Sequence, residues 1–308
     1  MILCCGEALI DMIPAPTTSG PDGFVPHAGG AVFNTAIALG RLGVKAGLLT
    51  GLSSDMFGQQ LSEALRASHV DTAHVIVADR PTTLAFVRLQ DGHATYSFFD
   101  ENSAGRMLGI GDLPTLSPDV TSLYFGGISL ACEPGANTYA AVLEREGGGR
   151  AVMMDPNIRS QFITDDTAYR ARLDRMMALT DIVKVSDEDL EWILPAPPSL
   201  EDKVRAVLKM GPSVVILTKG SDGATGYLHN GTEISAPARR VDIVDTVGAG
   251  DTFNAGVLAK LDALGWLEKS KLTDLPAEVL GQALDYGAQV AAVTVARAGA
   301  NPPWAGEL

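Results

Sequence analysis

The chain has 308 residues, of which 46% are hydrophobic and 19% charged, and this composition indicates a compact globular protein rather than a disordered one. Its formal net charge of −14 argues against a nucleic-acid partner, because proteins bind nucleic acids through basic surfaces. No apolar run approaches the ~20 residues of a membrane span, the N-terminus lacks a basic signal-like region and the three cysteines have no metal-binding spacing, so we expect a cytoplasmic protein without a membrane partner.

Short apolar runs alternate with longer helical patterns along the chain. Runs of four or five residues that are apolar on both faces are typical of buried parallel strands. The expected strands are residues 2–5, 46–50, 122–125, 151–155, 181–185 and 214–218. The expected helices are residues 33–42, 56–68, 137–146, 168–179, 200–210, 252–264 and 280–298. This alternation predicts an α/β fold with a doubly wound, mostly parallel sheet that carries helices on both faces.

One region near the N-terminus departs from this alternation. Residues 83–89 and 94–99 have strand patterns on either side of Gln-Asp-Gly-His, which is a hairpin signal. Residues 8–13 and 23–26 also have extended patterns. We therefore expect residues 1–308 to form a single domain with a small antiparallel β lid, built from about residues 8–28 and 73–104. Such a lid would cover the strand edge where ligands bind in α/β folds.

A loop of small residues near the C-terminus, residues 245–250, lies between an expected strand at 241–244 and a helix that opens at Asp251. Glycines let the backbone approach a ligand, and a helix N-terminus offers unpaired N–H groups, so the turn suits a phosphate. An Asp at a helix start is also a good N-cap. The residues alone therefore leave a phosphate site and a capped helix as equal alternatives. The chain contains neither a P-loop nor a dinucleotide-binding fingerprint.

The nine residues Asp-Thr-Val-Gly-Ala-Gly-Asp-Thr-Phe at 245–253 resemble the signature of the ribokinase-like (PfkB-type) family of carbohydrate kinases. The resemblance implies that the amides of Gly248, Ala249 and Gly250 stabilise the transferring phosphoryl group, and that Asp251 takes the proton from the sugar hydroxyl. It also implies ATP and Mg²⁺ as cofactors. The loop at Asp245 would help to hold a monovalent cation such as K⁺.

Two N-terminal motifs resemble the family's sugar-binding elements. Asp11 follows the first expected strand, and Gly29-Gly30 precedes Asn34 at the start of the first long helix. Taken alone, these are ordinary turn and helix-start residues, but the resemblance implies that Asp11, Gly29, Gly30 and Asn34 bind sugar hydroxyls. Ala31 stands where ribokinases often carry Lys, which favours the fructokinase-like branch.

A second pair of elements extends the resemblance on the substrate side. Asp-Pro-Asn-Ile-Arg at 155–159 is similar to an element of fructokinases and keto-deoxy-gluconate kinases, which implies that Asn157 faces the substrate and that Arg159 stabilises phosphate charge. Without the family, Arg159 would be read as a surface residue. Phe98, at the end of the hairpin, could pack against the apolar side of a sugar, although an aromatic residue in a strand is more often part of a core.

Three further segments resemble the nucleotide side of the family's site. Ser186 and Asp189 occupy the places of an Asn-x-x-Glu motif near the magnesium ion, although Ser186 is equally suited to cap a helix. Thr218, Gly220 and Gly223 match a Thr-x-Gly-x-x-Gly loop that lies against the nucleotide. Ala288, in the last long helix, replaces an Asn that is common beside the adenine.

Taken together, the resemblance implies an ATP-dependent sugar kinase, with fructose as the favoured substrate. The alternatives within this class are a 2-keto-3-deoxygluconate kinase and a ribokinase-like pentose or nucleoside kinase. A non-catalytic sugar or nucleotide sensor is less favoured because the reactive Asp and its loop are present. A nicotinamide oxidoreductase is disfavoured because the dinucleotide fingerprint is missing. The edges of the lid sheet need covering, so we expect a homodimer.

Overall fold

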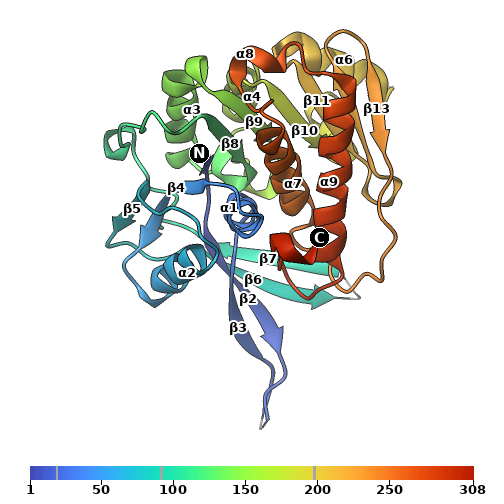
Figure 1. The fold of residues 1–308 in the computed structure, drawn as a ribbon. Helices are drawn as coiled ribbons and strands as arrows, with labels where there is room; N and C mark the ends of the chain where they lie inside the picture. Colours follow the sequence, from blue (N-terminus) through green and yellow to red (C-terminus); the bar gives the residue numbers. More distant parts are fainter. Residues whose placement is uncertain (19, 91–92, 197–198) are drawn as a thin grey trace.

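The computed structural model describes residues 1–18, 20–90, 93–196 and 199–308. Its larger sheet has the strand order β13-β12-β11-β10-β9-β8-β1-β4-β5 (Figure 1). Neighbouring strands are parallel from β11 to β5, and the pairs β11–β12 and β12–β13 are antiparallel. The strands are β1 (Ile2–Cys5), β4 (Ala46–Ser53), β5 (Val75–Ala78), β8 (Ser122–Gly126), β9 (Ala151–Asp155), β10 (Ile182–Ser186), β11 (Val214–Thr218), β12 (Ala224–Leu228) and β13 (Glu233–Ala236). The expected doubly wound sheet is confirmed.

Helices cover both faces of this sheet. The helices are α1 (Ala31–Arg41), α2 (Met56–Ala67), α3 (Gly135–Glu146), α4 (Asp166–Met177), α5 (Asp187–Ile193), α6 (Leu200–Met210), α7 (Ala249–Ala263), α8 (Lys269–Leu272) and α9 (Ala277–Val295). Within the described ranges, no helix combines the length and the apolar character needed to cross a membrane.

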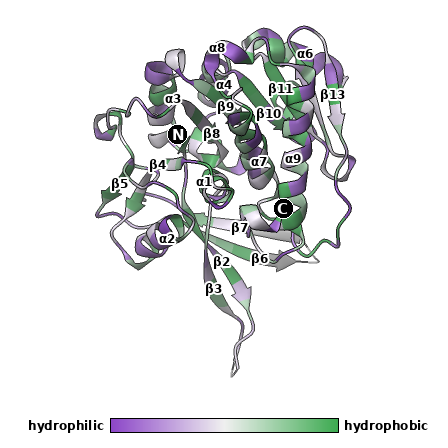
Figure 2. Ribbon diagram, in the orientation of Figure 1, coloured by the Kyte–Doolittle hydropathy of each residue, from purple (hydrophilic) through white to green (hydrophobic). Residues whose placement is uncertain are grey.

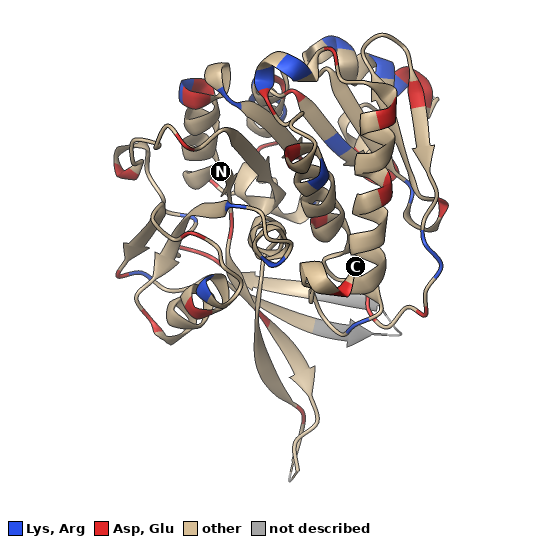
Figure 3. Ribbon diagram, viewed as in Figure 1, with Lys and Arg blue, Asp and Glu red and all other residues tan. Residues whose placement is uncertain are grey.

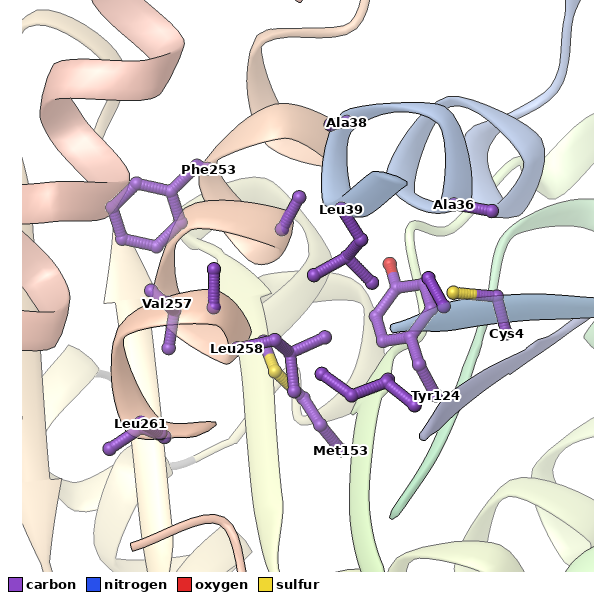
Figure 4. Packing of buried hydrophobic residues seen from close by; sticks show 14 of the residues in the cluster. Cys4, Ala36, Ala38, Leu39, Tyr124, Met153, Phe253, Val257, Leu258 and Leu261 are labelled. Atoms are coloured by element: carbon purple, nitrogen blue, oxygen red, sulfur yellow. The ribbon is translucent and has the colours of Figure 1, made fainter. Parts of the chain in front are cut away.

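Two hydrophobic cores lie on the two faces of the sheet. Ile2 and Cys4 of β1 pack in the core under α1, α2, α7 and α9, whereas Leu3 and Cys5 pack in the core under α3, α4 and α6. Successive side chains of a strand point to opposite faces, so a strand that is apolar at every position serves both cores. Figure 2 shows this as hydrophobic colour along the central strands, and Figure 4 shows Leu258 of α7 and Met153 of β9 in the first core.

A smaller sheet has the order β3-β2-β6-β7, from β2 (Leu9–Ala15), β3 (Gly23–Gly29), β6 (Leu84–Gln90) and β7 (His93–Phe99). It consists of two antiparallel hairpins joined by the parallel pair β2–β6, and the β2–β3 hairpin projects from the body (Figure 1). The turn expected between β6 and β7 falls on residues 91–92, outside the described residues. The expected lid segment began at about residue 73, but β5 instead pairs with β4 in the larger sheet.

The expectation of a strand at residues 241–244 was wrong, because this segment is irregular in the structure. The backbone N–H groups of Val244 and Asp245 donate to the carbonyl oxygen of Val295 at the end of α9, at 2.8 and 3.2 Å. The side chain of Ile243 is 67% exposed. A short run of β-branched residues has the pattern of a strand, but here it lies along a helix end rather than beside another strand.

The order of strands reverses at β1. The chain proceeds from β1 through β4 to β5 on one side and through β8, β9, β10 and β11 on the other. In open α/β sheets, ligands bind beyond the carboxyl ends of the strands at such a reversal. The fold therefore places the candidate site between this edge, the smaller sheet and the N-terminus of α7.

Candidate active site

A cavity of about 350 Å³ lies at this edge, a volume suited to a small ligand. It brings together ten of the site residues expected from the sequence, which come from both sheets and from α1 and α7. These residues are Asp11, Gly30, Asn34, Phe98, Asn157, Arg159, Gly248, Ala249, Gly250 and Asp251. The cavity is also lined by residues to which the sequence assigned no role, among them Glu7, Tyr96, Asp155, Gln161 and Lys184.

Asp251 presents a buried carboxyl group to this cavity, with 8% of the residue exposed. Its Oδ2 accepts a hydrogen bond of 2.9 Å from the side-chain amide of Asn34. Burial raises the pKa of Asp251 to about 7; the bond from Asn34 and the charge of Lys184 oppose this rise, and the charge of Asp155 adds to it. A carboxyl group that titrates near neutral pH is well suited to act as a general base.

The sequence reading that Asp251 caps the helix is corrected, because α7 begins two residues earlier. Gly248 is the N-cap residue and has a left-handed backbone with φ 78°. A Cβ at this position would lie 2.6 Å from Cβ of Ala300, so the turn needs glycine for space as well as for conformation. Asp251 is thus the third helical residue, and Gly248, Ala249 and Gly250 line the cavity at the positive end of the helix dipole.

Asp11 lies on β2 and faces the cavity from the smaller sheet. Burial raises the pKa of its carboxyl group to about 6. Gly29 does not line the cavity, but a Cβ at Gly29 would lie 2.2 Å from Oδ2 of Asp11. Gly30 has φ 108°, and its Cβ would lie 3.0 Å from the carbonyl oxygen of Glu7. The glycine pair therefore makes room for the Asp11 carboxylate and for the chain that enters α1.

Glu7 is a buried carboxylate behind this pair. It accepts hydrogen bonds from the backbone N–H of Ala31 at 3.1 Å and from that of Ser129 at 3.2 Å. Gly30, the N-cap residue of α1, has no side chain to cap the helix, so Glu7 takes that part. Burial raises the pKa of Glu7. Sequence reasoning passed over this residue because its partners are distant in sequence.

A buried ion pair also lines the cavity. Nζ of Lys184 on β10 is 2.9 Å from Oδ2 of Asp155 on β9, and the same oxygen accepts a 2.8 Å bond from Asn254 of α7. Burial lowers the pKa of Lys184, but the charge and hydrogen bond of Asp155, together with the charges of Asp189 and Asp251, outweigh it and the net shift is upward. The sequence did carry a signal for Lys184, because a lysine within an otherwise apolar strand is rarely buried without a partner.

Asn157, Arg159 and Phe98 also line the cavity. Asn157 has a left-handed backbone with φ 44°, and its N–H donates to Oδ1 of Asp155 at 3.2 Å. Arg159 is exposed, and its Nη1 donates to the carbonyl oxygen of Ile158 at 2.9 Å. The ring of Phe98 packs edge-on against that of Phe162, with centroids 4.3 Å apart.

The residues expected to bind metal ions do not line the cavity. Asp189 accepts a hydrogen bond of 3.0 Å from the N–H of Ile158, and burial raises the pKa of its carboxyl group. Asp245 accepts from the N–H of Val247 at 3.0 Å and from that of Gly299 at 2.9 Å. Asp245 thus ties the loop before α7 to the segment after α9.

The residues expected to bind the nucleotide also lie outside the cavity. Ser186 caps α5 by accepting from the N–H of Asp189 at 3.0 Å. Thr218 ends β11, and Gly220 and Gly223 form the next turn with φ of 51° and 90°. Ala288 is half-buried in α9. Ser186, Thr218, Gly220 and Gly223 thus lie at the carboxyl ends of β10 and β11, whereas Ala288 lies on α9.

The donor set fits a metal ion that arrives with a phosphate ligand. Within the described residues, no group of three or more His, Cys, Asp or Glu side chains could hold a metal ion. Magnesium typically takes one or two carboxylates together with phosphate oxygens and water. Asp155 lines the cavity, and Asp189 is close enough for the charge of Asp155 to raise its pKa further. These two carboxylates could serve a phosphate-bound metal.

A buried carboxyl group near a glycine-rich helix N-terminus, in a cavity lined by residues of both sheets, is an arrangement suited to phosphoryl transfer. The model of the pfkB family of carbohydrate kinases matches residues 1–305, and this chain belongs to that family. It is therefore a carbohydrate kinase.

Several individual carbohydrate and riboside kinases are similar to this chain. A fructokinase of Rhizobium leguminosarum bv. trifolii is 50% identical over 281 residues, covering 91% of this chain and 85% of that protein. The structure of fructokinase with bound ATP from Xylella fastidiosa has a TM-score of 0.89 and 29% identity, covering 97% of this chain and 93% of the other. Aminoimidazole riboside kinase from Salmonella enterica, complexed with its riboside and an ATP analogue, has a TM-score of 0.80 and 26% identity, covering 97% and 94%.

Proposed function

We propose that this chain is a fructokinase that transfers the γ-phosphoryl group of ATP to a hydroxyl of fructose. The observation that carries the proposal is the buried Asp251, with a pKa of about 7, at the N-terminus of α7. The similarity of this chain to fructokinases over most of its length supports fructose as the sugar.

In the proposed reaction, Asp251 accepts the proton of the sugar hydroxyl. The hydroxyl oxygen forms a bond to the γ-phosphorus as the bond from that phosphorus to the bridging oxygen of ADP breaks. The N–H groups of Gly248, Ala249 and Gly250 and the charge of Arg159 would stabilise the phosphoryl oxygens. Mg²⁺, bound through the phosphates, would neutralise further charge.

The other cavity residues would hold the sugar. Asp11, Asn34 and Asn157 offer carboxylate and amide groups for its hydroxyls, Gly30 gives close backbone approach, and Phe98 presents an apolar face. Gly29 would act through Asp11 by leaving space for its carboxylate.

The nucleotide would extend from the phosphate turn over the ends of β10 and β11. We propose contacts from Ser186, Thr218, Gly220, Gly223 and Ala288 to the ATP nucleoside. Asp189 would face the magnesium ion. The loop fixed by Asp245 would hold a monovalent cation such as K⁺ through backbone carbonyl groups.

Replacement of the base tests the mechanism. Asp251→Ala should abolish turnover while sugar and ATP binding stay measurable by calorimetry. Turnover near that of the wild type in this variant would refute the assignment of the base.

A coupled assay of ATP consumption tests the substrate. Fructose should give the highest kcat/KM among fructose, mannose, ribose, 2-keto-3-deoxygluconate and adenosine. Preference for ribose or adenosine would instead agree with the likeness to aminoimidazole riboside kinase. Tight sugar binding without any turnover would indicate a sensor.

We further propose that residues 1–308 form one catalytic domain whose smaller sheet closes over the sugar as a lid. The outer face of this sheet carries exposed apolar side chains, including Phe24 and Phe99, whose rings both pack edge-on against that of Phe86. Figure 3 shows few charges on the projecting β2–β3 hairpin. Apolar surface without charge favours burial in an interface, and we propose a homodimer formed through this face.

The free thiols of Cys4, Cys5 and Cys132 suit a protein of the reducing cytoplasm, and we propose that location.

A further inference from the structure

Lys184 places a positive charge in the wall of the cavity. Its side chain is 6% exposed, and that of its partner Asp155 is 2% exposed. Buried charges are costly unless they are paired, so the contact with Asp155 explains how the ammonium group is tolerated. This contact does not explain why Lys184 is one of the residues that line the cavity.

The ammonium group also lies beside the phosphate-binding turn. A Cβ placed on Gly250 would be 3.4 Å from Nζ of Lys184. An ammonium group has three donors, and within the described ranges Asp155 is the acceptor found within hydrogen-bond distance of Nζ. The remaining donors are therefore available to a ligand in the cavity.

We propose that Lys184 contacts the phosphoryl group during transfer and stabilises the charge on its oxygens together with the amides of Gly248, Ala249 and Gly250. This inference rests on the proposed phosphoryl transfer and adds no bond change to it, because Lys184 keeps its proton throughout. A charge fixed in a low-dielectric wall stabilises a transition state more strongly than an exposed one. Lys184 is therefore better placed for this task than the exposed Arg159.

The competing explanation is that Lys184 serves only to neutralise Asp155. Asp155 also accepts bonds from Asn254 at 2.8 Å and from the N–H of Asn157 at 3.2 Å, so its orientation does not depend on the lysine alone. A double-mutant cycle separates the two roles, since a purely neutralising lysine is not needed once the carboxylate is removed.

The cycle compares the wild type, Lys184→Met, Asp155→Asn and the double variant at saturating sugar and ATP. We expect Lys184→Met to lower kcat on the order of 100-fold in both backgrounds, the effect of removing one oxyanion donor. An unchanged kcat when Lys184→Met is added to Asp155→Asn would overturn the proposal. If Lys184→Met alone does not fold because the charge of Asp155 is left unpaired, the comparison of the double variant with Asp155→Asn decides, since Asp155→Asn keeps an amide oxygen that can accept a hydrogen bond from the ammonium group of Lys184.

Lys203→Met is the matched control. Lys203 is another buried lysine, with 1% of its side chain exposed and its Nζ 2.7 Å from Oε2 of Glu191, and it does not line the cavity. We expect Lys203→Met to lower the midpoint of thermal unfolding and to leave kcat unchanged. A loss of kcat in Lys203→Met as large as in Lys184→Met would mean that any buried lysine gives this effect, and would overturn the proposal.

A binding measurement gives a readout that is independent of turnover. ADP with aluminium fluoride mimics the phosphoryl group in transfer, and its affinity can be measured by calorimetry in the presence of sugar. Lys184→Met should weaken this complex on the order of 100-fold and leave the affinity for ADP unchanged. Equal weakening of both complexes would refute the proposed contact. Wild-type turnover across the sugar panel tests the proposed function separately, because it involves no variant of Lys184.

Discussion

The side-chain amide of Asn34 donates a hydrogen bond of 2.9 Å to Oδ2 of Asp251, and so connects α1 to α7 in the wall of the cavity. This bond favours the charged form of Asp251 against the effect of burial. Asn34 is held in turn by the start of α1, which Glu7 caps. A chain of contacts therefore runs from the end of β1 to the proposed base.

The pH dependence of activity should report the bond between Asn34 and Asp251. Asn34→Leu removes the donor, so the pKa of Asp251 should rise above about 7. The base must be deprotonated to act, so the acid limb of kcat/KM should move to higher pH and activity at pH 7 should fall. Asp155, Lys184 and Glu7 also influence this carboxyl group and are unchanged in the variant.

Thr35→Val provides the control for this pH profile. Thr35 donates to the backbone oxygen of Asp251 at 3.1 Å rather than to its carboxylate. The acid limb should therefore keep its position in Thr35→Val. An acid limb that is unchanged in Asn34→Leu would contradict the expected role of the bond.

Removal of the Asp251 charge should stabilise the folded protein at high pH. The pKa is about 7 in the folded state and the ordinary value is 3.8. Between these values the unfolded chain loses its proton while the folded protein keeps it, so the stability cost grows as pH rises and is complete above about pH 7. At about 1.4 kcal/mol per pKa unit, the cost reaches roughly 4 kcal/mol.

Urea unfolding of Asp251→Asn and the wild type measures this cost. The variant should be more stable by up to roughly 4 kcal/mol at pH 8, and the difference should nearly vanish at pH 4. Asp262→Asn makes the same chemical change on the exposed side of α7 and serves as control. A difference for Asp251→Asn that is equal at both pH values would show that the charge is not its cause.

Gly29→Ala should weaken sugar binding without touching the cavity itself. The new Cβ would lie 2.2 Å from Oδ2 of Asp11, so the carboxylate must turn away. Loss of a hydrogen bond to a charged group costs about 1.5–3 kcal/mol, which corresponds to roughly a 10- to 100-fold rise in KM for the sugar. Gly148→Ala, where a Cβ would meet nothing within 4 Å, should leave KM unchanged. Equal KM values in both variants would argue against a role for Asp11.

The close crossing of α7 and α9 should be sensitive to one methyl group. A Cβ on Gly287 would lie 2.9 Å from the carbonyl oxygen of Phe253, so Gly287→Ala should destabilise the fold by about 1–3 kcal/mol in urea unfolding. Gly281→Ala lies on the same helix and would meet only the side chain of Ile234, at 3.3 Å. It should be neutral or stabilising by up to about 1 kcal/mol, because alanine favours a helix. The reverse order of stabilities would contradict this packing.

The proposed dimer should depend on the outer face of the smaller sheet. Phe99→Asp puts a charge among its exposed aromatic residues and should give a monomer in sedimentation equilibrium, whereas the wild type should sediment as a dimer. Val77→Asp changes a residue on β5 of the larger sheet that is 64% exposed, compared with 57% for Phe99, and this variant should remain dimeric. A wild type that is monomeric at micromolar concentration would disprove the proposal.

The sequence predicted the larger sheet well, because its strands are apolar on both faces and alternate with helices. Residues 2–5, 151–155 and 214–218 have the same bounds in the structure as in the expectation. The antiparallel strands β12 and β13 were missed; β13 lies at the edge of the sheet, and only Ala236 of its four residues is buried, so its apolar signal is weak. The segment 241–244 failed for the opposite reason, because its β-branched residues mimic a strand while contacting a helix end.

For the site, motifs located ten of the residues that line the cavity but missed Glu7 and Lys184, which line it too. Glu7 caps α1 and Lys184 pairs with Asp155, and partners this distant in sequence cannot be identified from local patterns. The start of α7 was misplaced because the left-handed backbone of Gly248, rather than a capping side chain, begins the helix. The roles of the nucleotide-side and metal-side residues remain predictions.

The cavity draws its residues from two sheets, with Asp11 and Phe98 on the smaller one and Asp251 on a helix of the larger one. In the proposed reaction, a sugar long enough to touch both would act as a bridge that joins them. Water can reach Asp251 but is too small to form that bridge. Because the site is built from both sheets, the enzyme would select its acceptor by length as well as by the chemistry of its hydroxyl. This selection would limit the hydrolysis of ATP by water.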